Sequence, residues 1–174
     1  MLFRSSLNGS VPAGASINAT TGQFTWTPAP AQAGQVYAFG VRATDDGAGS
    51  LFAEETVHVG VGYTWTGFLP PVNADGSSVF KLGRTVPVKF ALTGPSAGVN
   101  NAVARLYVAK FTDNVLGTEE QADSTSAATT GNLFRYSDGQ YIFNLSTDGL
   151  TAGTYQLRVD MGDGVPRLVN ISLR

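Results

Sequence analysis

The sequence contains no cysteine among its 174 residues, which excludes a disulfide framework, a thiol nucleophile and a metal site built on cysteine. Histidine is nearly absent as well, since His58 is the only one. A Ser-His-Asp triad would have to use this residue, and a His-rich zinc site is excluded because zinc ordinarily takes several His or Cys ligands. The alternation of apolar and polar residues around His58 directs its side chain outward from a strand. We therefore expect a protein that is not an enzyme.

Charge and long apolar runs are also scarce. Charged residues make up 14% of the chain and its net charge is -2, whereas an average soluble protein has roughly 25% charged residues. The 11 Lys and Arg residues form no basic run, so we expect no nucleic-acid partner. No apolar run approaches the roughly 20 residues of a membrane span, so we expect no membrane insertion.

No signal peptide follows Met1. The composition, rich in Thr, Ser, Asn, Gln and Gly, is common in secreted β-sandwiches, and we expect an extracellular or cell-surface location. If the protein is exported, this chain is a fragment or its signal has been removed.

Strand signals run through the whole chain. Residues 85–92 alternate clearly, with Val86, Val88 and Phe90 on one parity and Lys89 on the other. This pattern predicts a strand with one face in a core and one in water. Similar alternation predicts further strands at residues 24–28, 36–44, 54–61, 104–111, 140–145, 153–161 and 167–174. Residues 112–132 are polar and longer than most connections, which indicates a mobile or functional loop.

The first part of the chain carries a family resemblance. Residues 11–18, 20–28, 33–34 and 41–45 read VPAGASIN, TTGQFTWTP, AG and VRATD. In order and spacing these blocks resemble the cadherin-like, "putative Ig" repeats of bacterial surface and secreted proteins. The resemblance implies a seven-stranded sandwich over residues 1–61 that lacks its two N-terminal strands. Such an opened sandwich would expose unpaired backbone groups at its edge.

The second part resembles a different bacterial extracellular module. Residues 87–90 read PVKF and match the Pro-x-Lys-Phe motif for which the PxKF module is named. Residues 67–72, 134–144, 147–148 and 152–155 also fit this module. The resemblance implies an immunoglobulin-like sandwich over residues 62–174, of a kind found near the C-termini of large secreted proteins. We therefore expect an all-β chain of two tandem immunoglobulin-like β-sandwich domains, the first without its N-terminal strands.

Asp45 and Asp46 are candidate calcium ligands, because calcium takes several hard oxygen ligands. In cadherin-like repeats the Ala-Thr-Asp segment, here residues 43–45, can supply one of them at a domain joint. The alternative is ordinary turn chemistry, in which Asp side chains accept hydrogen bonds from nearby backbone N–H groups. No other cofactor is expected.

Tyr63 and Trp65 share one parity in an aromatic segment and are candidates for a shallow carbohydrate face. The alternative is that they pack at the joint between the two domains. Lys89 and Asn144 are candidates for an intramolecular cross-link of the kind that joins strands in some surface proteins. Such a bond needs a desolvated, neutral lysine, and the parity of both residues favours a plain cross-strand contact instead.

The sequence favours a non-catalytic spacer and interaction module of a bacterial surface or secreted protein, with other protein domains of the same or neighbouring chains as partners. Two alternatives remain open. One is a carbohydrate-binding accessory domain of a secreted hydrolase, with polysaccharide as partner. The other is a structural subunit that assembles through the open edge of the first domain.

Overall fold

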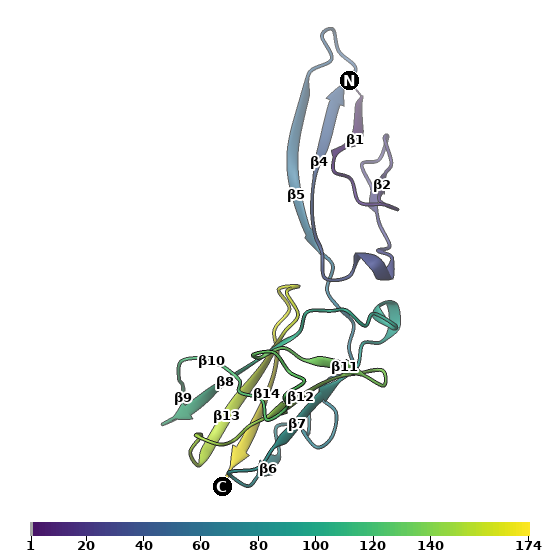
Figure 1. Cartoon of the computed structure of the whole chain (residues 1–174). Helices are drawn as coiled ribbons and strands as arrows, with labels where there is room; N and C mark the ends of the chain where they lie inside the picture. Colours follow the sequence, from purple (N-terminus) through teal and green to yellow (C-terminus); the bar gives the residue numbers. More distant parts are fainter. Residues whose placement is uncertain (1) are drawn as a thin grey trace. The chain divides into compact units, whose positions relative to one another are not determined.

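A computed structural model describes residues 2–174 (Figure 1). Strands dominate, and the only helices in this range are two short 3-10 turns, η1 (Pro30–Gln32) and η2 (Gly94–Ser96). The predicted all-β class is therefore confirmed. The chain forms two compact units, Met1–Gly62 and Tyr63–Arg174, which we call unit 1 and unit 2.

Unit 1 is built on one antiparallel three-stranded sheet in the order β1-β4-β5. The strands are β1 (Phe3–Gly9), β4 (Val36–Asp45) and β5 (Phe52–Gly60). The long β4–β5 hairpin turns between Asp45 and Phe52 and pairs Phe39 with Val57. A small hairpin of two-residue strands packs against one side of this sheet, which we call the inner face. It consists of β2 (Ser16–Ile17) and β3 (Phe24–Thr25).

The small hairpin covers the inner face incompletely. The ring of Phe24 stacks on that of Phe39 with 5.5 Å between centroids, and the ring of Trp26 meets the ring of Tyr37 edge-on at 5.1 Å. Phe39 is 3% exposed, but Phe24 remains 38% exposed and Trp26 is only half-buried. Within residues 2–62, Phe39 and Ala33 are the only hydrophobic side chains that are buried. Unit 1 is thus a thin, open half of a sandwich.

Unit 2 contains two sheets. One has the order β10-β8-β13-β14-β6, with β9 added to β8, and the other has the order β11-β12-β7. The strands of the larger sheet are β6 (Ser78–Phe80), β8 (Arg105–Thr112), β9 (Val115–Leu116), β10 (Glu120–Gln121), β13 (Gly153–Asp160) and β14 (Arg167–Leu173). Those of the smaller sheet are β7 (Val86–Phe90), β11 (Arg135–Ser137) and β12 (Gln140–Leu145). All ladders are antiparallel except that between β6 and β14.

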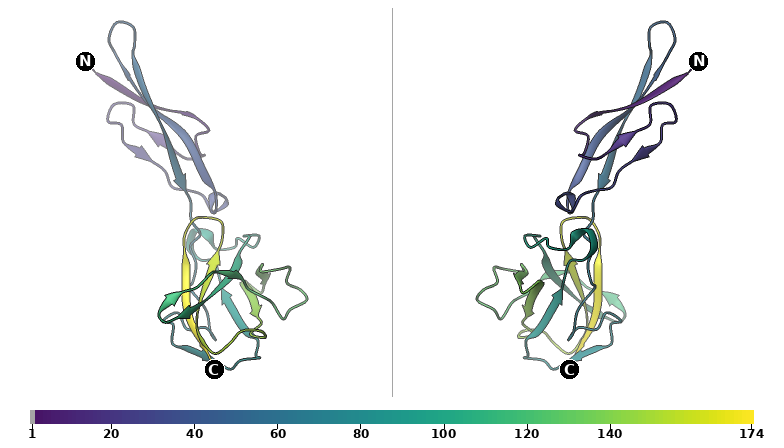
Figure 2. Two further views of the ribbon diagram at one scale, coloured as in Figure 1. Left: turned by 90° about the vertical axis from the view of Figure 1, so that its left-hand side faces the viewer. Right: turned by 90° about the vertical axis from the view of Figure 1, so that its right-hand side faces the viewer.

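The two sheets of unit 2 enclose one continuous core, and Figure 2 shows them from two sides. In β7 the side chains of Val86, Val88 and Phe90 are all at most 1% exposed, while Pro87 and Lys89 face outward and are half-buried. The ring of Phe90 stacks almost parallel on that of Tyr141, with centroids 4.9 Å apart. The alternation predicted for this strand is confirmed. Unit 2 is a complete, immunoglobulin-like β-sandwich.

The polar stretch at residues 112–132 differs from the long loop that the sequence suggested. β9 and β10 within it both pair with β8, so two short parts of the stretch extend the larger sheet. Ala122 is 2% exposed and Asn132 is 5% exposed. The amide of Asn132 donates a hydrogen bond of 3.0 Å to the carbonyl of Leu106. The stretch was misread because its strands are only two residues long, too short to show alternation.

Candidate functional site

The two candidate calcium ligands take part in the turn between β4 and β5. Asp45 Oδ1 accepts hydrogen bonds from the backbone N–H groups of Gly47 and Leu51, both at 3.1 Å. Asp46 Oδ1 accepts one from the N–H of Leu2 at 2.9 Å. Nowhere in residues 2–174 do three or more His, Cys, Asp or Glu side chains gather as a metal site. This geometry matches the turn chemistry weighed above, and calcium binding stays a prediction.

The candidate sugar-stacking residues belong to the edge of the core of unit 2. The ring of Trp65 meets the rings of Phe68 and Phe90 edge-on, at centroid distances of 5.2 and 5.8 Å. The guanidinium of Arg167 lies 5.6 Å from the same ring. Burial, and then the nearby carboxylate of Asp163, raise the pKa of Tyr63 above its ordinary value. Trp65 is half-buried among these neighbours, an arrangement that gives no support to a flat platform for sugars.

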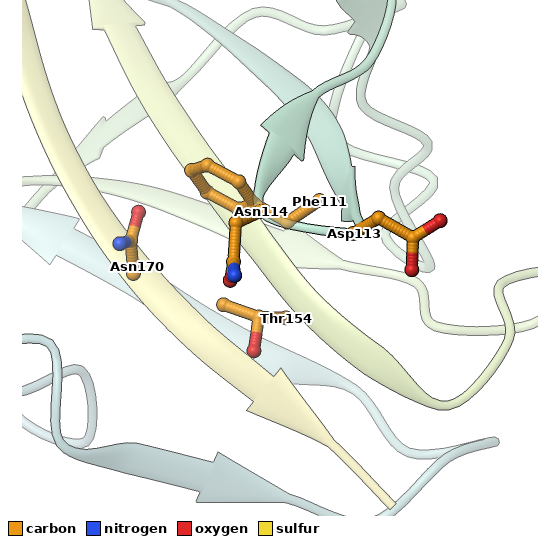
Figure 3. Close-up of a pocket in the computed structure, with 5 residues that line it drawn as sticks. All are labelled: Phe111, Asp113, Asn114, Thr154 and Asn170. Atoms are coloured by element: carbon orange, nitrogen blue, oxygen red, sulfur yellow. The ribbon is translucent and has the colours of Figure 1, made fainter.

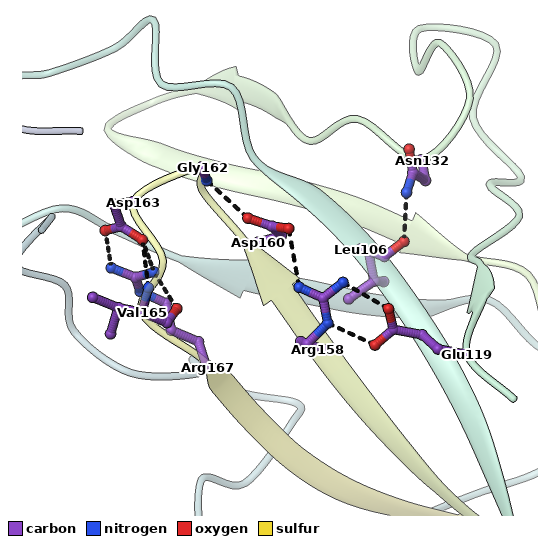
Figure 4. Close-up of polar contacts among 9 residues, drawn as sticks. All are labelled: Leu106, Glu119, Asn132, Arg158, Asp160, Gly162, Asp163, Val165 and Arg167. Atoms are coloured by element: carbon purple, nitrogen blue, oxygen red, sulfur yellow. Dashed lines mark hydrogen bonds and ion pairs between the residues drawn. The ribbon is translucent and has the colours of Figure 1, made fainter. Parts of the chain in front are cut away.

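Arg167 and Asp163 form a buried ion pair beside these aromatic residues (Figure 4). Arg167 donates to Asp163 Oδ1 at 2.8 Å and to Oδ2 at 2.6 Å, and it also donates to the carbonyl of Tyr63 at 3.1 Å. Asp163 in turn accepts the backbone N–H groups of Tyr63, at 2.8 Å, and Val165, at 3.2 Å. Burial alone would raise the pKa of Asp163, but these hydrogen bonds outweigh burial and hold the pKa below its usual range.

Sequence reasoning missed this ion pair, although a signal for it exists. Arg167 has the same parity as Val169, Ile171 and Leu173, so alternation in β14 places the arginine on the core side. A charged residue in that position needs a partner, and Asp163 in the preceding turn is the nearest acid along the chain. The pair fixes the backbone of Tyr63, the first residue of unit 2.

The two cross-link candidates lie on the outer face of the smaller sheet of unit 2. Lys89 pairs with Ile142, and Asn144 pairs with Pro87, so the two residues are diagonal neighbours on adjacent strands. Both are half-buried. A plain polar contact across the strands is compatible with this placement, and the covalent bond stays a prediction.

One Gly-x-Ser-x-Gly string, residues 94–98, matches the pattern of a hydrolase nucleophile elbow. Its Ser96 is 1% exposed, and the Oγ atom accepts a hydrogen bond from the N–H of Thr64 at 3.0 Å. The segment forms η2 and a turn rather than the strand-to-helix turn that exposes a nucleophile. Ser96 therefore has a structural role. His58 is exposed on β5.

The outer margin of β5, which we call the free edge, is a first candidate interaction surface. Asp45 N–H donates to the carbonyl of Leu51, and Val61 N–H donates to the carbonyl of Gln35. Leu51 and Val61 directly precede and follow β5, so the odd-numbered residues direct their backbone hydrogen bonds to β4. Hydrogen bonding alternates along an antiparallel strand. The even-numbered residues of β5, such as Thr56, consequently direct their N–H and C=O groups to the free edge. No strand within residues 2–174 pairs there.

Two polar side chains of β5, Glu54 and His58, lie along the free edge. Glu54 accepts hydrogen bonds from Arg42 and Asn8, at 2.9 and 2.6 Å, and these bonds lower the pKa of Glu54. His58 lies four residues further along the same face of β5 and is exposed. Sheet edges of this length are usually protected by Pro, Lys or a bulge, and β5 contains neither residue.

A second candidate surface is a hollow of about 520 Å³ on the outer face of the larger sheet of unit 2 (Figure 3). We call it the β8–β14 hollow. Its lining residues come from β8, the β8–β9 turn, β13 and β14, and they are Phe111, Asp113, Asn114, Thr154 and Asn170. Sequence reasoning missed this site, because the ladders bring together residues that are far apart along the chain.

The comparison with known proteins concerns unit 1 first. The model of the family described as "Putative Ig domain" matches residues 3–66. This segment is similar to the Putative Ig domain. The resemblance read from residues 11–45 is therefore confirmed, while the resemblance of unit 2 to the PxKF module stays a prediction. No curated protein sequence matches the chain.

Several solved structures are similar to parts of this chain. They include cadherin domains 3–6 of protocadherin gamma B2 (17% identity, TM-score 0.32), domains 3–5 of Drosophila OTK (13%, 0.43), and the N-terminal eight Ig domains of Down syndrome cell adhesion molecule (15%, 0.37). These matches cover 99%, 98% and 98% of this chain. The chain in turn spans 43%, 50% and 20% of those structures.

Proposed function

We propose that the chain is a non-catalytic spacer and interaction module of a bacterial cell-surface or secreted protein. The observation that carries this proposal is the similarity of residues 3–66 to the Putative Ig domain, together with the complete sandwich of unit 2. Immunoglobulin-like and cadherin-like domains are typical of extracellular adhesion and interaction modules. Such modules work through their edges and loops, and partners are expected among domains of the same or neighbouring chains. In residues 2–174 no helix is long and apolar enough to cross a membrane.

The construction of unit 2 suits a spacer. At its start, the backbone of Tyr63 is tied to the buried pair of Arg167 and Asp163. At its end, β14 lies between β13 and β6 and bonds to both. Pulling on either end must therefore break a buried ion pair or two strand ladders. Both kinds of contact resist separation of the chain ends.

Localisation tests the proposal most directly. An antibody raised against the chain should label intact cells of the organism that makes it, or detect the protein in the medium. A protease added to intact cells should remove the cell-bound signal. Detection only after lysis, with full protection from protease before lysis, would contradict an extracellular role.

A second candidate function is assembly of two copies of the chain through the free edge of β5. A twofold axis through Thr56, perpendicular to the sheet, would pair Thr56 with its own copy and place Glu54 of each copy opposite His58 of the other. Cross-strand Thr–Thr pairs stabilise sheets, and an imidazole N–H can donate a hydrogen bond to a carboxylate. The free N–H and C=O groups of the even-numbered residues would then be satisfied.

Light scattering over a range of concentrations tests this second candidate. The chain should double its mass as concentration rises. Thr56→Pro removes an edge N–H that β4 does not use, so it should keep the chain monomeric. Thr56→Val keeps that N–H and should still dimerise. A chain that stays monomeric at every concentration would refute assembly through β5.

A further inference from the structure

We propose that the β8–β14 hollow is a binding site for a neutral saccharide. Five residues line it, and four of them, Phe111, Asn114, Thr154 and Asn170, contribute a group that sugars engage. The site is separate from the free edge of β5. It adds a ligand class to the proposed interaction module without depending on how that module assembles.

The sheet register builds the site. Tyr155 pairs with Lys110, so the next residues outward along the two strands, Thr154 and Phe111, share the outer face of the sheet. Gln156 pairs with Asn170, which makes Asn170 a diagonal neighbour of Thr154 on the same face. Diagonal neighbours lie roughly 7–8 Å apart. This spacing allows one small ligand to contact both.

The β8–β9 turn forms one wall of the hollow. Its two central residues, Asp113 and Asn114, have φ angles of 51° and 64°, the left-handed values that a two-residue hairpin turn requires. The turn holds Asn114 over the sheet near the ring of Phe111. In Figure 3 the carboxylate of Asp113 points away from the other four side chains. The only charged group among the lining residues is therefore turned away from the two carboxamides and the hydroxyl.

The polar groups inside the hollow are free to bind. Within residues 2–174, the side chains of Asn114, Thr154 and Asn170 make no hydrogen bond of their own, in contrast to Asn132, whose amide is committed to the carbonyl of Leu106. Two carboxamides and one hydroxyl thus converge on one space beside an aromatic ring. Each carboxamide offers both donors and an acceptor.

This combination selects for a sugar over other ligand classes. Neighbouring hydroxyls of a sugar ring donate and accept at once, which a carboxamide can match, and the apolar face of the ring can lie on Phe111. A phosphate, sulfate or uronate would meet no cationic side chain in the lining. A purely apolar ligand would leave the amides without partners, which costs free energy. The volume of about 520 Å³ lies within the usual range of roughly 300–1,000 Å³ for ligand sites.

A second hollow, which Asp75 also lines, shares one residue with the first and offers room for a second sugar unit. It measures about 270 Å³, shares Asn170 with the first hollow, and is also lined by Gln156 and Leu168. The turn around Gly76 forms its far wall, where an added Cβ would lie 3.7 Å from Asn170. An oligosaccharide could therefore occupy both hollows, with Asn170 between two sugar units.

Native gel electrophoresis of the whole chain through embedded polysaccharides tests the site. The probes are neutral glucan, mannan, galactan and arabinoxylan, with polygalacturonate and heparin as anionic comparisons. At least one neutral polysaccharide should retard the chain, and the anionic ones should not. Asn114→Gly suits the left-handed turn and removes only the amide, and Asn170→Ala removes the shared amide. Each should weaken retardation roughly fivefold or more.

The matched control is Asn100→Ala, an exposed loop residue that does not line either hollow; it should bind as the unchanged chain does. Absence of retardation by every neutral polysaccharide would overturn the proposal. So would retardation that survives both substitutions, or equal retardation by the anionic polysaccharides. These outcomes are independent of the localisation assay, so failure of the saccharide site and failure of the proposed module can be told apart.

Discussion

Arg167 Nη2 lies 2.6 Å from Asp163 Oδ2, and both side chains are only 1% exposed. Four donors converge on the carboxylate, two from Arg167 and two from the backbone. Taking two charges out of water is costly, and such a pair is tolerated only when nearly every lone pair is satisfied. The relationship therefore makes unit 2 sensitive to the loss of either partner.

Removing the acid should be the more informative change. Asp163→Asn leaves the Arg167 charge buried and unpaired, and we expect a loss of about 3–5 kcal/mol in the free energy of unfolding of unit 2. Urea unfolding followed by circular dichroism measures this loss. Glu119→Gln is the matched control, because its pair with Arg158 is 38% exposed on the acid side. It should cost about 1 kcal/mol or less, and an equal cost for both variants would contradict the prediction.

The same carboxylate should make stability depend on acid pH. Folding lowers the pKa of Asp163, so the unfolded chain binds this proton more readily than the folded one. The stabilisation is then fully present above the unfolded value of about 3.9 and is lost as the pH falls through the lower folded value. Urea midpoints measured from pH 5 down to pH 2 should fall more steeply for the unchanged chain than for Asp163→Asn. Parallel curves would show that another carboxylate controls the acid transition.

The aromatic centre of the core should tolerate little truncation. Phe90 is fully buried and its ring contacts those of Trp65, Phe134 and Tyr141. Phe90→Ala should lower the free energy of unfolding by about 3–5 kcal/mol. Val79→Ala is the control, since Val79 is 48% exposed, and it should change stability by less than about 0.5 kcal/mol. Chemical denaturation of the two variants gives the comparison.

The two units should unfold separately, with unit 1 first. Each contains one tryptophan, Trp26 in unit 1 and Trp65 in unit 2. Trp65→Phe leaves a fluorescence signal from unit 1 alone, and Trp26→Phe leaves one from unit 2 alone. Because Ala33 and Phe39 are the only buried hydrophobic residues of residues 2–62, the Trp26 signal should change at lower urea concentration. Coincident transitions would show that the units stabilise each other.

Alternation of apolar residues predicted much of unit 2. β7, β12, β13 and β14 each repeat with period two because one face of each lies in the core. The same pattern is weak where burial is incomplete. The strand predicted at residues 24–28 is only the two-residue β3 in the structure, because the small hairpin of unit 1 packs against only part of the sheet. β9 and β10 were missed because two residues cannot show a period.

The candidate sites were harder to predict for a different reason. Asp45 could be identified as a polar turn residue from its own sequence neighbours, and its hydrogen bonds are local. Asn114 and Asn170, in contrast, come to one hollow only through the ladders that join β8, β13 and β14. Trp65 was ambiguous because an aromatic strand residue can pack or stay exposed. The rings that it contacts in the structure, those of Phe68 and Phe90, could not be identified from its own segment.

Residues 112–132 are attached to the sandwich of unit 2 at two points. A bridge from Ser124 to Leu145 holds one side of the stretch, and Asn132 holds the other. Between these two fixed points, residues 125–131 are half-buried or exposed. Lengthening a segment whose ends are already held together adds little entropic cost. Insertions there could diversify the surface of unit 2 from one relative to the next while the sandwich beneath stays the same.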